Sequence, residues 1–273
     1  MKRIMRTLIL TCVILTLTVP VLQAQEGQLV LQGSTTVLPI AQAAAEVFMQ
    51  KNPQANISVR GGGSGNGIAA LIDGTCDIAD ASRSMKVEEI LLCQKKGISP
   101  VSNIIAMDGI AVVVHPSNPV EGLSMEQIKD IYAGKVTNWK EVGGKDQKIV
   151  VVSRDSASGT FETFNELVLK GEKVTPEALA QASNQAVATT VASSEGAIGY
   201  VGLGYLNETI KALAVNGVIP EQETVVSGKY PISRPLYMYT NGAPQGVAKD
   251  LIEFIWSEEG QKIVKEQGFV PLP

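Results

Sequence analysis

Two observations on the sequence predict a mixed α/β fold. Short apolar runs of strand length alternate with segments whose apolar residues follow a helical pattern, as in chains that alternate strands and helices. The 273 residues are 45% hydrophobic and 18% charged, and they contain no charge block or G-X-Y period. Disordered, collagen-like and coiled-coil chains are therefore excluded, and the length suffices for one large or two modest domains.

The first 24 residues are predicted to be a cleaved signal peptide. Basic residues at positions 2, 3 and 6 precede an apolar run that ends near Val21, and the sequence LQA provides a cleavage site before Gln25. The run is short of the roughly 20 apolar residues of a membrane anchor, the alternative. Cleavage removes three cations and no acid, so the formal net charge changes from -4 to -7. We therefore expect export, and no binding to nucleic acid, which needs a basic surface.

The rest of the chain is predicted to alternate strands and helices in order. Apolar runs predict strands at residues 28–32, 56–60, 110–115, 148–153, 197–201 and 235–240. Helical patterns occur at residues 38–51, 67–73, 86–96, 124–133, 161–169, 175–181 and 244–256. A final helix at 258–267 ends before Gly268, which suits a C-terminal glycine cap.

Two extended segments, 109–116 and 233–240, are candidates for crossings between two lobes. No linker rich in Pro, Gly or Ser divides the chain into sequential halves. If both segments cross, one lobe comprises residues 25–109 and 239–273, and the other comprises residues 110–238. A ligand cleft is then expected between the lobes.

Three loops share one design, in which a strand leads through Gly, Ser and Thr residues into a helix. Their sequences are GSTT at 33–36, GGGSGNG at 61–67 and RDSASGT at 154–160. Free N–H groups at a helix start attract anions, and small residues allow close approach of the backbone. One such loop is explained by helix capping alone. Three loops, one of which carries Arg154, favour a shared anion site, because the guanidinium fork suits oxyanions.

Other motifs do not support competing chemistry. The glycine loop lacks the lysine of a phosphate-binding P-loop, and the segment from Gly65 to Ala70 matches a dinucleotide fingerprint only loosely. No metal-ligand motif is present, and His115 is the single histidine, so we expect no metal and no cofactor. Cys76 and Cys93 remain after signal cleavage and are predicted to form a disulfide, with two buried thiols as the alternative.

Several longer segments together resemble one known family. They are GSTTVLP, GGGSGNGI, DIADASRSM, MDGIAVVVHPSNP, IKDIYAGKVTNW, RDSASGTF, EGAIGYVGLGYL and EEGQKIVKEQGFVPLP. In this order they resemble the periplasmic phosphate-binding proteins of ABC-type phosphate importers, over nearly the whole mature chain. The resemblance implies a type II periplasmic-binding-protein fold, in which two α/β lobes joined by two crossing strands close on one phosphate.

The resemblance also implies a set of phosphate ligands from the three loops. Matched position by position, they are Thr35, Thr36, Ser64, Arg154, Ser158, Gly159 and Thr160. Ser34 and Ser82 are further candidates from the same motifs.

One position departs from the family pattern. The best-known members have an aspartate directly after the Ala-Ser of the third motif, where it accepts the phosphate proton, and this chain has Arg83 there. We expect Asp108 to replace that acceptor, with Asp80 second; Arg83 is a possible ligand or the partner of a cleft carboxylate. A carboxylate acceptor would distinguish phosphate, which carries a proton at neutral pH, from sulfate.

The expected function is that of an exported, periplasmic binding protein. The resemblance implies that it captures inorganic phosphate and delivers it to the inner-membrane permease of an ABC importer, and we expect a monomer without enzymatic activity. The alternatives are a receptor for another tetrahedral oxyanion, such as sulfate, molybdate or tungstate, and an extracytoplasmic phosphatase or hydrolase. The latter needs a nucleophile with a base or a metal cluster, for which the sequence offers no motif.

Overall fold

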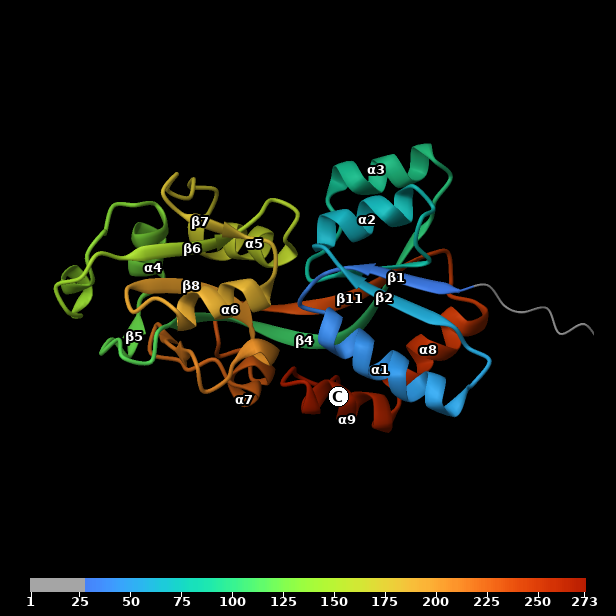
Figure 1. Ribbon diagram of the computed structural model, residues 1–273. Coiled ribbons are helices and arrows are strands. Elements are labelled where there is room, and N and C mark those ends of the chain that lie inside the picture. The colour runs from blue at the N-terminus through green and yellow to red at the C-terminus, as the bar shows by residue number, and fades with distance from the viewer. Residues whose placement is uncertain (1–27) are drawn as a thin grey trace, which may run out of the picture.

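The computed structural model describes residues 28–273, so the predicted signal peptide lies outside the described residues. Strands and helices alternate along most of the chain, and the predicted α/β class is confirmed (Figure 1). The strands are β1 (Leu29–Gly33), β2 (Ile57–Gly61), β3 (Ile78–Ala81), β4 (Pro100–Val114), β5 (Gly122–Leu123), β6 (Val150–Arg154), β7 (Leu179–Gln181), β8 (Ala197–Gly202), β9 (Lys211–Ala212), β10 (Ala214–Val215) and β11 (Ser233–Asn241). The α-helices are α1 (Leu38–Lys51), α2 (Ser64–Ile72), α3 (Val87–Lys95), α4 (Met125–Tyr132), α5 (Gly159–Phe164), α6 (Asn184–Ala192), α7 (Gln222–Val226), α8 (Gly246–Trp256) and α9 (Glu258–Glu266). Shorter helical segments are η1 (Trp139–Val142), the π-helical η2 (Asn165–Leu169) and η3 (Leu203–Tyr205).

One nine-stranded sheet connects both halves of the described chain. Its order is β2-β1-β3-β11-β4-β8-β6-β7, with β9 also paired to β4. The strands β1, β2 and β3 are parallel to each other, and so are β6, β7 and β8. Residues 100–109 of β4 pair with β11, and residues 110–114 pair with β8, so β4 belongs to both halves. Figure 1 shows β4 and β11 side by side where the two halves meet.

The apolar core consists of three clusters of buried side chains. One cluster packs α1, α8 and α9 on one face of β1, β3 and β11, and a second packs α2 and α3 on the opposite face. The third and largest draws its residues from 110–232 together with Val270. In it the rings of Phe164 and Tyr200 stack with centroids 4.1 Å apart. The lobe boundaries that follow residues 24, 109 and 238 stay a prediction. Leu236 and Met238, on either side of the last boundary, both pack in the cluster that contains α1, α8 and α9.

The predicted helix at residues 175–181 is wrong. Ala178 donates its N–H to the Thr175 carbonyl in a turn, and the residues that follow form β7, which pairs in parallel with β6. Pairing with the sheet satisfies the backbone of this segment and overrides its helical propensity. The sequence reading also omitted β3, α6, α7 and the first part of β4, and it took α5 and η2 as a single helix.

The predicted disulfide is also wrong, because Cys76 and Cys93 are free, buried thiols. Both side chains pack in the α2–α3 cluster, where the Cys76 sulfur is directed at the carbonyl of Gly67, 3.7 Å away. Burial raises the pKa of the Cys76 thiol to about 12, so this thiol stays protonated and unreactive. Within residues 28–273, no helix combines the length and the apolar character that a membrane crossing requires.

Candidate functional site

Three loops at the carboxyl ends of parallel strands meet between the apolar clusters. They follow β1, β2 and β6 and lead into α1, α2 and α5. In open α/β sheets, ligands bind at the carboxyl ends of the strands, where helix N-termini present free N–H groups. Small polar side chains of these loops are buried here: Ser34, Thr35, Thr36, Ser64, Ser158 and Thr160.

The loops after β2 and β6 approach each other within contact distance. The N–H of Gly65 donates to the Ala157 carbonyl at 2.9 Å. A Cβ on Gly159 would lie 2.3 Å from the Ser64 hydroxyl oxygen and 2.7 Å from that of Ser82. Ser82 in turn donates its N–H to Ser64 Oγ at 3.0 Å. Only glycine permits this approach, which places two hydroxyl groups against the N-terminus of α5.

A second group of hydroxyls joins the loops after β1 and β6. Thr36 Oγ1 lies 3.0 Å from Thr160 Oγ1. Asn184, the first residue of α6, donates from Nδ2 to Thr35 Oγ1 at 3.1 Å and to Thr36 Oγ1 at 3.0 Å. Its Oδ1 accepts from the Gly202 N–H at 3.2 Å. The Asn184 amide therefore fixes the positions of both threonine hydroxyls.

Arg154, at the end of β6, brings one positive charge to these hydroxyls. Its Nε donates to the Gln181 carbonyl at 2.9 Å, and its Nη2 donates to the Ala182 carbonyl at 3.1 Å and to Thr35 Oγ1 at 3.4 Å. The side chain is buried, and Nη1 has no partner among the described residues. Burial lowers the pKa of Arg154, but a guanidinium keeps its charge in proteins. A buried cation with an unused donor is suited to binding an anion.

A buried ion pair between Asp108 and Arg234 lies beside the same hydroxyls. The two residues face each other across β4 and β11, and Asp108 Oδ2 accepts from Arg234 Nε at 3.1 Å and from Nη2 at 2.9 Å. Arg234 Nη2 also donates to Thr36 Oγ1 at 3.2 Å and to Thr160 Oγ1 at 3.0 Å. Burial raises the pKa of Asp108, while the charge and hydrogen bonds of Arg234 oppose this rise. The pair holds a second guanidinium at the junction of the loops.

These groups together define the site, which we call the hydroxyl–arginine cluster: Thr35, Thr36, Ser64, Ser82, Asp108, Arg154, Gly159, Thr160, Asn184 and Arg234. It contains two guanidinium groups and one carboxylate, so its net charge is positive. No group of three His, Cys, Asp or Glu side chains in residues 28–273 is arranged to hold a metal ion. Donors from hydroxyls, helix N-termini and guanidiniums suit a small oxyanion.

Comparison with known proteins identifies the family. The profile of the PBP superfamily domain matches residues 20–259. The chain is 38% identical over 251 residues to the phosphate-binding protein PstS of Bacillus subtilis, and the match covers 90% of this chain and 81% of that protein. The chain belongs to the PBP superfamily, in its phosphate-binding protein family.

Solved structures of similar proteins agree with this assignment to the phosphate-binding protein family. A phosphate ABC transporter substrate-binding protein from Clostridium perfringens, solved with bound phosphate, has 38% identity and a TM-score of 0.84. The match covers 90% of this chain and all of that one. An ABC-type phosphate transport receptor from Vibrio cholerae has 34% identity and a TM-score of 0.73, with the same coverage of both chains. The periplasmic-binding-protein fold that the sequence predicts is thereby confirmed.

The structure brings most of the ligands expected from the phosphate-binding protein family into or beside the hydroxyl–arginine cluster. Two of them accept hydrogen bonds from backbone N–H groups close to the start of a helix. Ser34 Oγ accepts from the N–H groups of Thr36 and Val37, at 3.1 and 3.3 Å. Ser158 Oγ accepts from the Phe161 N–H at 3.2 Å and caps α5.

Two candidates make no hydrogen bond to the cluster. Arg83 donates from Nη1 and Nη2 to the carboxylate of Glu89, in the first turn of α3, at 2.8 and 2.7 Å. Asp80 is 1% exposed, and neither of its carboxyl oxygens has a partner among the described residues. Burial raises the pKa of Asp80 to about 8.

Sequence reasoning missed Arg234 and Asn184. Arg234 lies in a segment that was predicted as a crossing, and a charged residue inside an apolar strand was the available signal. Its pairing with Asp108 depends on the register of β11 against β4, which the sequence does not reveal. Asn184 follows Ser183 at the start of a helix that was not predicted, so its role had no local signal.

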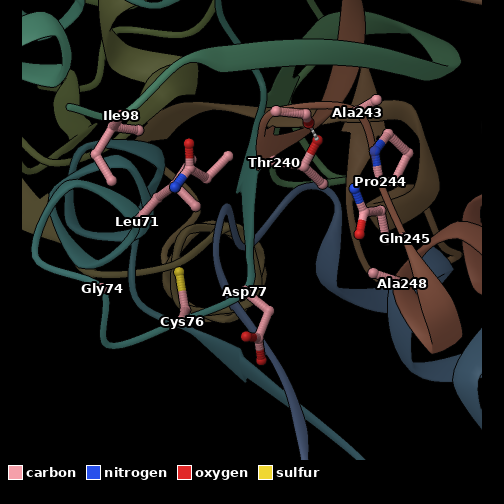
Figure 2. A pocket seen from close by; sticks show the side chains of 12 residues that line it. Leu71, Gly74, Cys76, Asp77, Ile98, Thr240, Ala243, Pro244, Gln245 and Ala248 are labelled. Atoms are coloured by element: carbon pink, nitrogen blue, oxygen red, sulfur yellow. Dashed lines mark hydrogen bonds between the residues drawn. The ribbon is translucent and has the colours of Figure 1, made fainter.

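Of two hollows in the surface, one borders the hydroxyl–arginine cluster and the other does not. One, of about 530 Å³, borders Arg234 and is lined by Lys86 and Glu162, whose charged groups lie 2.8 Å apart. The other, of about 450 Å³, lies at the opposite end of β3, where Cys76 and Asp77 precede the strand (Figure 2). Its lining includes the Asp77 carboxylate and no cationic side chain. The second hollow is therefore unsuited to an anion.

Proposed function

We propose that this chain captures inorganic phosphate in the hydroxyl–arginine cluster and delivers it to an ABC-type importer. The observation that carries the proposal is Arg154, a buried guanidinium with an unused Nη1 donor beside the hydroxyls of two helix-starting loops. The relatives of this chain support the choice of phosphate as ligand, because they are named as phosphate-binding proteins and one was solved with phosphate bound.

The chemistry of the cluster matches a tetrahedral oxyanion. Arg154 supplies a planar fork, which suits two oxygens of one phosphate group. The hydroxyls of Thr36 and Ser64 and the N–H groups at the starts of α1, α2 and α5 supply donors without further charge. A small anion can be surrounded only if the loops approach closely, which the glycine at position 159 allows.

The assigned role is binding and not catalysis. Relatives are named as binding proteins and transport receptors, and we infer that this chain transfers its ligand to a membrane permease. We infer that the chain acts as a monomer on the outer side of the inner membrane, in the periplasm, after removal of residues 1–24. The basic and apolar pattern of those residues supports export.

Isothermal titration of the purified chain with phosphate and with sulfate tests this function. We expect phosphate to bind more tightly than sulfate. Arg154→Ala should weaken phosphate binding by about 1.5–3 kcal/mol, the scale of a hydrogen bond to a charged group, and the fold should survive. Arg60→Ala, which removes an exposed arginine at the end of β2, is the matched control and should bind as wild type does. If wild type binds sulfate and not phosphate, the ligand assignment is wrong; if Arg154→Ala binds phosphate as tightly as wild type, the site is wrong.

A further inference from the structure

Arg234 has the same features that make Arg154 a candidate for anion binding. Both residues are 4% exposed, and the Nη1 atom of each has no partner among the described residues. Each guanidinium donates to a threonine hydroxyl of the loop after β1. Arg234 Nη2 also reaches Thr160, in the loop after β6, so it contacts both sides of the cluster. A buried guanidinium with an unused donor in this position is a second cation available to an oxyanion.

The carboxylate of Asp108 is largely occupied by hydrogen-bond partners from the protein itself. An ionised carboxylate offers about four lone-pair sites. Two are used by the Nε and Nη2 groups of Arg234. The N–H of Leu203 donates to Oδ1 at 3.0 Å, so three of the four sites are used by the protein. The carboxylate therefore serves to hold the guanidinium in place.

We propose that Arg234 is a second cationic contact of the bound oxyanion and that Asp108 is a positioning residue for it, in place of the proton acceptor that the sequence suggested. The proposal rests on the function proposed above, and it changes the expected basis of selectivity. Two guanidiniums and one carboxylate attract the ligand by its negative charge. Discrimination between phosphate and sulfate then does not depend on Asp108.

The test uses variants that separate a direct contact between Arg234 and the anion from the effect of the net charge of the cluster. The double variant Arg234→Gln with Asp108→Asn removes one charge of each sign, so the net charge of the cluster is unchanged and no buried charge loses its partner. We expect it to lose about tenfold to hundredfold in affinity for phosphate and for sulfate alike in isothermal titration, the loss typical of a charged hydrogen bond. Arg234→Lys, which keeps the charge but loses the fork, should show a similar loss of phosphate affinity. Arg60→Lys is the control at an exposed arginine and should bind as wild type does.

The single variant Asp108→Asn tests the positioning role. An acceptor role predicts that sulfate binding rises while phosphate binding falls, because an amide can donate to a fully deprotonated oxyanion. A positioning role predicts that both affinities change in the same direction and that their ratio stays within about threefold of wild type. Thermal unfolding of each variant establishes that it is folded.

The outcomes separate this inference from the proposed function. Failure of wild type to bind phosphate contradicts the function itself. If wild type binds phosphate and Arg154→Ala loses it, but a folded Arg234→Lys and the double variant both bind like wild type, Arg234 is not a ligand contact. A gain of sulfate binding by Asp108→Asn overturns the positioning role of Asp108 and restores it as acceptor.

Discussion

Asp80 is a buried carboxyl group whose surroundings provide nothing to stabilise its charge. In the sheet it lies between Gly33 of β1 and Met238 of β11, neither of which has a polar side chain. Both carboxyl oxygens are without partners among the described residues, and burial raises the pKa of Asp80 to about 8. An ionised carboxylate is costly to bury unpaired, so Asp80 carries a proton at neutral pH.

The stability of the protein should therefore depend on the ionisation of Asp80. The folded-state pKa lies above the ordinary value of 3.8, so the folded chain holds a proton that the unfolded chain releases between about pH 4 and pH 8. The free energy of unfolding should fall as the pH rises through this interval. Asp80→Asn removes the titrating group, and its free energy of unfolding should exceed that of wild type by a few kcal/mol at about pH 8, with little difference at about pH 4.

Urea denaturation across this pH range measures the effect of Asp80. Asp250→Asn, which changes an exposed carboxylate of α8, should keep the pH dependence of wild type. Equal pH dependence of the wild type and the Asp80→Asn variant would show that the carboxyl is ionised without cost in the folded protein.

Single residues were predictable from the sequence where their role depends on local chain geometry. Thr35, Ser64 and Arg154 lie at or just after the end of a strand, so each could be placed at a sheet edge before the fold was known. Arg234 was not predictable in this way, because its contact with Thr36 joins residues 198 positions apart. Such a contact depends on the register between β4 and β11, and the residues of the two strands do not by themselves specify that register.

At the scale of elements, α6 shows how the first residue of a helix can organise the site. Its first residue, Asn184, bonds two hydroxyls of the loop before α1 and the N–H of Gly202 at the end of β8. The amide is fully buried, so its removal leaves these partners without compensation from water. The same helix packs Val187 and Val191 into the largest apolar cluster, which fixes its position.

Asn184→Ala should therefore lower stability and loosen the threonine hydroxyls. We expect the free energy of unfolding to fall by about 1–3 kcal/mol, the cost of leaving buried polar groups unsatisfied, and phosphate affinity to fall with it. Chemical denaturation and titration measure the two effects. Gln185→Ala, at the adjacent exposed position of α6, is the control and should change neither quantity. A variant with wild-type stability would mean that the Asn184 amide contributes no net stabilisation.

The segment around β7 shows that the secondary structure of a segment cannot always be predicted from its own residues. Residues 175–181 have the composition of a helix, yet they form a turn and a short strand beside β6. The β7 conformation places the Gln181 carbonyl where Arg154 Nε donates to it, and the Ala182 carbonyl follows. The error in this helix prediction therefore lies next to the site, because tertiary pairing there outweighs local propensity.

At the scale of the whole molecule, most side-chain contacts between the two halves are polar. Besides β4 and β11, the halves meet at hydrogen bonds such as those from Gly65 to Ala157 and between Thr36 and Thr160, and at the ion pair of Lys86 with Glu162. The two larger apolar clusters lie mainly on either side of this junction and are linked by Val270 and by Tyr205, which packs against both. Interfaces within one chain that lack a large apolar contact permit relative motion of the parts they join.

We therefore expect phosphate to shift the chain towards a more compact form. An anion that bonds Arg154 and Thr160 from one half and Thr36 and Ser64 from the other makes all its contacts only when the halves are close, so it stabilises the close arrangement by this difference in affinity. Small-angle X-ray scattering of the purified chain should show a smaller radius of gyration with saturating phosphate than without it. Arg154→Ala, at the phosphate concentration that saturates wild type, should show a smaller decrease. An unchanged radius in a sample that binds phosphate by titration would mean that the halves do not move relative to each other, and that the ligand enters through local motion of the loops alone.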